Sequence, residues 1–127
     1  MKKNIITLIG VIVFALASTT AIAHHSAAPF DFTQQVNLKG VVKKFTVVNP
    51  HSYIKLEVTD EDRGTRDIVF EGMSASTFYR AGYTRNSVKV GDVIQVTFAP
   101  RYNKDDGGFI MSFVTSGGKD IGFTGGQ

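Results

Sequence analysis

The sequence predicts a mostly β domain, a small barrel of five strands with one short helix between the third and fourth strands. From Gln35 onward, turn residues recur roughly every ten residues, with β-branched and aromatic residues between them. Helical spacing occurs in one short stretch, and the chain has no cysteine, so packing must hold the domain together without disulfides. This order of elements is that of an OB-like Greek-key barrel.

The first two strands are expected on either side of a proline turn. Residues 36–48 alternate around Gly40 and change phase near residues 43–44, which predicts a bulge or a sharp bend in one long strand. Asn49-Pro50 ends this strand, because proline lacks the backbone donor of a ladder. Residues 52–59 then alternate cleanly between apolar and polar side chains, as a half-buried strand does.

The remaining elements follow polar turns. Residues 65–71 predict the third strand, and Ser74 is expected to cap about two turns of helix. Residues 93–99 and 109–115 predict the fourth and fifth strands.

Residues 1–23 have the layout of a secretory signal peptide. Two lysines precede an almost uncharged apolar stretch of about 13 residues, which is shorter than the roughly 20 that a membrane-spanning helix needs. Ala21 and Ala23 supply the small-residue pattern that a signal peptidase reads, so we expect cleavage after Ala23. Cleavage after Ala17 and an uncut membrane anchor are the alternatives.

Export would leave a nearly neutral protein in the periplasm, without membrane association. The chain has 14 basic and 11 acidic residues, and the leader removes two lysines and no acid, which leaves a net charge of +1. This charge offers no field to attract phosphates and argues against nucleic-acid binding. The mature chain would comprise an N-terminal segment over 24–35, the barrel over 36–116 and a flexible glycine-rich tail over 117–127.

Three histidines, His24, His25 and His51, are the strongest candidates for a metal site. Cleavage after Ala23 would make His24 the first residue, whose α-amine and ring Nδ1 can chelate one ion together. The unperturbed pKa values of an α-amine and an imidazole are about 7.7–8.0 and 6.5, so a metal displaces few protons at neutral pH. His51 would add a third nitrogen and complete a planar set that suits a copper ion. His25 is the alternative third ligand.

Further candidates surround this site. Glu71 and Asp31 could accept a hydrogen bond from a ligating histidine, although Glu71 also fits a turn or a helix cap. Met73 and Met111 are the only thioethers of the mature chain and could serve cuprous ion, or fill the core or its rim. The alternative for the histidines themselves is that the pair is a solvated tail and His51 a turn residue.

A second hypothesis is a non-enzymatic periplasmic module that binds a protein partner or a small ligand through an aromatic face. Its residues would be Tyr53, Tyr79, Tyr83 and Phe109. The sequence has no nucleophile motif, phosphate loop or paired-carboxylate signature, so an enzyme is not expected. A copper monooxygenase built on the histidine site is the third hypothesis.

Three stretches carry a resemblance to a known family. "HHSAAPFDF", "GVVKKFTVVNPHSYIKLEV" and "FEGMSASTFYRAGYTRNSVKVGDVIQV" together resemble an uncharacterised family of small exported bacterial proteins with HHS, NPHS and Phe-Glu-Gly motifs. The resemblance covers residues 24 to about 115 and implies no established activity. Where such proteins often place tryptophan, this chain has Tyr53 and Tyr83. A contact of these rings with a cation would be weaker than that of an indole.

Overall fold

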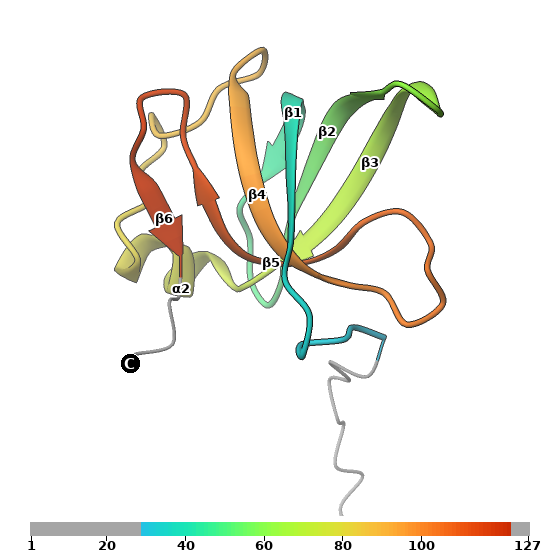
Figure 1. The fold of residues 1–127 in the computed structure, drawn as a ribbon. Helices are drawn as coiled ribbons and strands as arrows, with labels where there is room; N and C mark the ends of the chain where they lie inside the picture. Colours follow the sequence, from blue (N-terminus) through green and yellow to red (C-terminus); the bar gives the residue numbers. More distant parts are fainter. Residues whose placement is uncertain (1–28, 123–127) are drawn as a thin grey trace, which may run out of the picture.

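Strands dominate residues 29–122, the part of the chain that the structure, a computed structural model, describes (Figure 1). No helix in this range is long and apolar enough to cross a membrane. In chain order the elements are β1 (Val36–Thr46), β2 (Ser52–Asp60), β3 (Gly64–Gly72), α2 (Ala75–Arg80), β4 (Val93–Pro100), β5 (Gly108–Val114) and β6 (Asp120–Gly122).

The first five strands form a closed barrel. They are ordered β3-β2-β1-β4-β5, with antiparallel pairing throughout, and a parallel pairing of Glu71 with Phe109 joins β3 back to β5. The predicted fold class, a mostly β barrel of five strands with one short helix between the third and fourth, is confirmed. This strand order is compatible with the expected OB-like topology.

Strand β1 serves two sides of the barrel. Its first half pairs with β4 and its second half with β2, and the register with β2 shifts between Val42 and Lys44. The predicted change of phase at residues 43–44 is therefore confirmed. Gly40 is needed because a Cβ at this position would lie 2.9 Å from the carbonyl oxygen of Glu57.

Helix α2 covers the end of the barrel where β3 stops. Ser74 caps it as predicted, because its hydroxyl accepts a hydrogen bond from the Thr77 N–H at 3.3 Å. Phe78 points from the helix into the core, and Gly72 leaves room for its ring, since a Cβ at Gly72 would lie 3.0 Å from it. The helix therefore closes the barrel with one large apolar side chain.

Aromatic rings pack the core beneath this helix. Phe113 is fully buried, and its ring centroid lies 5.7 Å from that of Phe45 and 5.9 Å from that of Phe78. Such edge-on and tilted ring pairs add about 0.5–1.5 kcal/mol each beyond the burial of apolar area. The other fully buried side chains of the barrel interior are Val42, Ile54, Leu56, Ile68, Phe70, Ile94, Val96 and Ile110.

The segment after residue 116 differs from the expected flexible tail. A turn stabilised by a 2.9 Å hydrogen bond from Thr115 N to Lys119 O returns the chain to β5, where β6 pairs antiparallel with it. Ile121 is completely buried. A single apolar residue in a polar, glycine-rich stretch has no periodicity, so the sequence pattern could not reveal this strand. Residues 123–127 lie outside the described range.

An arginine clamp ties the loop between β4 and β5 to the start of β3. Both guanidinium NH groups of Arg63 donate to the Asp106 carboxylate at 2.8 Å, and Arg66 Nε donates to it at 3.0 Å. Arg66 also pairs with Asp60. Hydrogen bonds from Arg63 and then Arg66 hold the pKa of Asp106 below its ordinary value. We use the name arginine clamp for Arg63, Arg66 and Asp106.

Truncation of Phe113 tests the aromatic core. Phe113→Ala removes a fully buried ring and is expected to lower the free energy of unfolding by about 3–5 kcal/mol, measured by denaturant titration. Val90→Ala is the control, because Val90 is 72% exposed and should change stability by less than about 0.5 kcal/mol. Equal effects of the two substitutions would contradict this description of the core.

The arginine clamp predicts a pH-dependent contribution to stability. A carboxyl group whose folded-state pKa lies below its ordinary 3.8 stabilises the fold above that pH, and the stabilisation is lost as the pH falls through the lowered folded-state pKa. Asp106→Asn should therefore lower the free energy of unfolding at neutral pH, by about 1 kcal/mol for a partly exposed pair. The difference from the wild type should shrink as the pH falls below 3.8 and vanish below the lowered folded-state pKa.

Denaturant titrations at neutral pH and at about pH 3 measure this difference. Asp105→Asn is the matched control, because Asp105 accepts hydrogen bonds from Asn103 and has no arginine partner within residues 29–122. A deficit of Asp106→Asn that stays constant across this pH range would rule out the clamp as its cause.

Candidate functional site

The turn between β1 and β2 holds His51 in a fixed backbone. Ser52 is buried and exchanges hydrogen bonds with Val48, through Val48 N to Ser52 Oγ at 3.2 Å and Ser52 Oγ to Val48 O at 3.3 Å. The start of α2 binds the same turn, since Ala75 N donates to Val48 O at 2.9 Å and Ser76 N to Asn49 Oδ1 at 3.4 Å. The turn therefore presents His51 from a rigid support.

The ring of His51 lies against a carboxylate and an aromatic ring. Its Nδ1 contacts the Oε1 atom of Glu71, and its ring stands edge-on to Phe109, 6.3 Å between centroids. Glu71 lies in register with Tyr53 on one side and Phe109 on the other. A neutral imidazole that donates its Nδ1–H to this carboxylate carries its lone pair on Nε2, the form in which histidine binds metals.

The N-terminal anchor, residues 29–32, packs on the same aromatic ring. Phe30 is only 4% exposed and lies 5.6 Å from Phe109 between ring centroids, and Phe32 lies 5.5 Å from it. The backbone joins the barrel through Asp31 N to Pro100 O at 2.8 Å and Tyr102 N to Pro29 O at 3.0 Å. Phe109 is thus shared by the N-terminal anchor and by His51.

This arrangement brings the start of the described chain to the His51 edge of the barrel. His24 and His25 lie outside the described residues. The six residues from His24 to Phe30 span at most about 20 Å when extended. Because the rings of Phe30 and His51 lie 5.6 Å and 6.3 Å from the ring of Phe109, a histidine at position 24 or 25 has enough chain to reach His51.

Asp31 is not brought to His51. Its carboxylate accepts hydrogen bonds from Thr33 N at 3.0 Å, Thr33 Oγ1 at 2.6 Å and Gln34 Nε2 at 2.7 Å. The hydrogen bond from the Thr33 side chain holds the pKa of Asp31 below its ordinary value. Asp31 therefore shapes the turn that leads into β1, a local use of aspartate that competes with longer contacts.

The four residues of the expected aromatic face do not form one surface but divide into two pairs. Tyr53 is 45% exposed on the outside of β2, and Tyr79 is half-exposed on α2. Tyr83 is 7% exposed and packs against Phe45 in the core, where burial raises the pKa of its hydroxyl. Phe109 belongs to the cluster around the N-terminal anchor. Tyr79 and Tyr83 lie together, 5.6 Å between ring centroids, and Tyr53 and Phe109 lie in register with Glu71 between them.

The described residues do not hold a complete metal site by themselves. Within residues 29–122, no three histidine, aspartate or glutamate side chains come together as a metal-binding group. Met73 packs against the hydrophobic core, as expected for a filler, and Met111 lies half-buried on β5. A metal at His51 would therefore need ligands from outside this range.

Sequence reasoning missed the two phenylalanines of the N-terminal anchor. Phe30 and Phe32 flank Asp31 at a spacing of two, which is a strand-like alternation that could have indicated a pairing with the barrel. The arginine clamp was also missed, because Asp106 lies 43 residues after Arg63 and 40 residues after Arg66, so no local pattern links them.

The fold and this site define a small β-barrel protein with a histidine–glutamate pair beside an aromatic cluster. The chain belongs to a family of unknown function, DUF6152, which matches residues 12–110, so the expected membership in an uncharacterised family is confirmed. No curated protein matches the chain.

One solved structure is similar in part. It is the crystal structure of the ZRD-deleted mutant of TiaS in complex with agmatine, with a TM-score of 0.45 and 12% sequence identity. The match covers 74% of this chain and 23% of that one. A likeness of this size carries no argument about function.

Removal of the Phe30 ring tests the N-terminal anchor. Phe30→Ala should release residues 29–32 from the barrel, because it removes the contact with Phe109 and the ring beneath the Arg101 guanidinium, 4.9 Å from its centroid. Hydrogen exchange followed by NMR should then show lost protection at the Asp31 and Tyr102 amides.

Protection of the β2–β3 amides should stay unchanged in this variant, because that pairing does not involve the anchor. Phe32→Ala is the control, since Phe32 is exposed and its loss should reduce protection at the Asp31 amide far less. Wild-type protection at Asp31 in Phe30→Ala would show that the ring does not hold the segment.

Proposed function

We propose that this protein is an exported, periplasmic metal-binding protein that prefers copper, with its site formed by His51 and a new N-terminal histidine. The observation that carries the proposal is the position of His51, whose Nδ1 contacts Glu71 and whose ring shares Phe109 with the N-terminal anchor. Cleavage of the leader after Ala23 would place His24 within chain reach of this position.

The donor set would be three nitrogens. His24 provides its α-amine and its ring Nδ1, which close one chelate ring, and His51 provides its Nε2. Few divalent ions prefer three nitrogens in a planar or T-shaped arrangement, and cupric ion does so most strongly. His25 is the substitute for His51 or a neighbour of the site.

Glu71 would fix the tautomer and the orientation of His51. Metal-binding histidines usually donate their second ring N–H to a carboxylate or carbonyl, and loss of such a partner reduces metal affinity about 10- to 100-fold. Phe109, which lies against the His51 ring, would limit the access of water to the site, and Phe32 packs on Phe109.

The second candidate is a non-enzymatic module that binds a periplasmic protein or a small ligand through aromatic side chains. The observation that favours it is the exposed surface around Tyr53 and Phe32, each more than 40% exposed, on either side of the Glu71–Phe109 pair. Metal-free protein that retains a partner from a periplasmic extract, and loses it on Tyr53→Ala, would support this module over the metal site.

Copper titration of the mature protein tests the first proposal. Intact mass of the protein purified from the periplasm should show a chain that starts at His24, and isothermal titration should give one cupric ion per chain. His51→Ala and the addition of one residue before His24 should each weaken binding by at least tenfold, because each removes a nitrogen ligand. Glu71→Ala should weaken it about 10- to 100-fold.

Glu57→Ala is the matched control, because Glu57 pairs with Lys43 at 2.9 Å on the outside of the barrel and should leave the affinity unchanged. Circular dichroism checks that each variant keeps the fold. Copper affinity that is insensitive to both His51→Ala and the N-terminal extension would reject the site, as would a mature chain that starts at a residue other than His24.

A further inference from the structure

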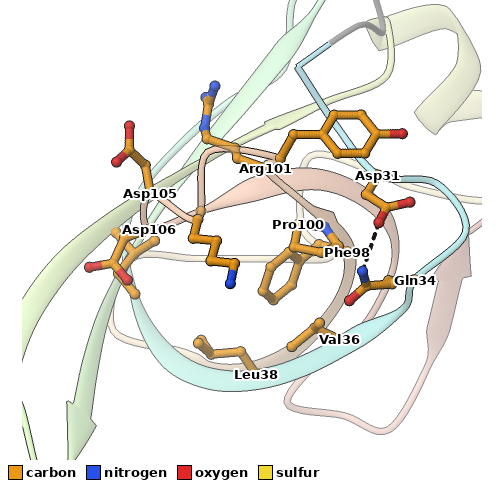
Figure 2. A pocket seen from close by; sticks show the side chains of 13 residues that line it. Asp31, Gln34, Val36, Leu38, Phe98, Pro100, Arg101, Asp105 and Asp106 are labelled. Carbon is orange, nitrogen blue, oxygen red and sulfur yellow. Dashed lines mark hydrogen bonds between the residues drawn. The ribbon is translucent and has the colours of Figure 1, made fainter.

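A pocket of about 430 Å³ opens at the end of the barrel beneath the loop between β4 and β5. Figure 2 shows Val36 and Leu38 of β1 along one wall, Phe98 and Pro100 of β4 at the centre, and the loop residues around them. Binding sites for small molecules range from about 300 to 1,000 Å³, so the volume suits one small ligand. His51 does not line this pocket, so it is separate from the proposed metal site.

The floor of the pocket is apolar. Ile68 and Phe98 are buried side chains of the barrel interior that form part of the lining, and Val36 and Leu38 are left partly open to solvent there. A ligand with an apolar body would remove this surface from water, which is favourable in proportion to the apolar area covered.

Each carboxylate on the polar rim accepts hydrogen bonds from residues other than Lys104. Asp106 is held by the arginine clamp, Asp31 accepts hydrogen bonds from Thr33 and Gln34, and Asp105 accepts from Asn103. The ammonium group of Lys104 has no hydrogen bond or ion-pair partner among residues 29–122. Arg101 is the second cation of the lining, and its guanidinium lies over the Phe30 ring, 4.9 Å from the centroid. Lys104 is therefore the cation of the rim that a bound anion can pair with.

Lys104, on the rim of this pocket, has a strained backbone conformation. Lys104 has φ 62°, in the left-handed region, and it is the one residue other than glycine with positive φ in the described part of the chain. The loop is fixed on both sides of it, by the bridge of Phe30 with Arg101 and by the arginine clamp at Asp106. Strain of this kind persists only where the surroundings enforce it, and it is common at ligand clamps.

We propose that this pocket binds a small monocarboxylate with an apolar alkyl or aryl body. The apolar body would lie against Val36, Leu38 and Phe98, and the carboxylate would pair with the ammonium group of Lys104. The site is independent of the metal proposal, since it uses neither His51 nor the N-terminal histidines.

NMR titration of the mature protein with four probes tests this proposal. Octanoate and 3-phenylpropionate represent an alkyl and an aryl carboxylate, and octanol and octylammonium share the octanoate body without its negative charge. We expect amide shifts confined to the pocket residues and at least about fivefold tighter binding of a carboxylate than of either octanol or octylammonium. Tighter binding of one carboxylate than the other identifies the body that the floor accepts.

Substitutions at Lys104 separate charge from strain. Lys104→Gln should reduce octanoate affinity about fivefold, whereas Lys39→Gln, at an exposed position of β1 outside the pocket, should leave it unchanged. Lys104→Gly should reduce octanoate affinity by the same factor as Lys104→Gln. It should keep or raise the melting temperature, because glycine adopts this backbone conformation without strain. Val36→Trp should block the pocket.

Three results would overturn the proposal. They are equal binding of octanoate and octylammonium, octanoate affinity that Lys104→Gln leaves unchanged, and the absence of pocket shifts with all four probes. Because Lys104 is exposed, its variants are expected to fold, so the test does not depend on the behaviour of Val36→Trp.

Discussion

The parallel pairing of Glu71 with Phe109 is the constraint on which both the fold and the candidate site depend. It is the place where β3 meets β5, so it closes the barrel. The same two residues supply the carboxylate and the ring that contact His51. Their separation is therefore set by the hydrogen-bonded register of the barrel and not by flexible loops. The geometry of such a site is fixed by the strands of the sheet and is kept as long as the sheet stays folded.

The N-terminal anchor extends this constraint to a segment outside the barrel. Phe30 packs on Phe109, and backbone hydrogen bonds fix Pro29 and Asp31 to the end of β4 and the residues after it. The anchor also divides two surfaces of different chemistry. Its aromatic side meets His51 through Phe109, while Asp31 lines the apolar pocket under the neighbouring loop. One short segment thus contributes to the His51 edge of the barrel and to an apolar pocket.

Local patterns in the sequence predicted the long strands and the helix, but they could not predict contacts between residues far apart in the chain. Alternation and turn residues located the strands, and Ser74 marked the start of α2, because these signals depend on near neighbours. Tyr83 was expected on a surface but lies in the core. The short sequence around it has no periodicity that shows which side chains face the barrel interior. Asp31 bonds locally, and the packing of Phe30 on Phe109 depends on tertiary structure.

The burial of Ile121 shows that the folded unit extends through β6. β6 covers part of β5, and the side chain of Ile121 fills space among the core residues. A shortened chain that stopped after the last long strand would expose a hole in the hydrophobic interior and leave the β5 edge open to pairing with other molecules. Fusion partners and cleavage sites therefore belong beyond Gly122, because glycine content alone is a poor guide to where this domain can be cut.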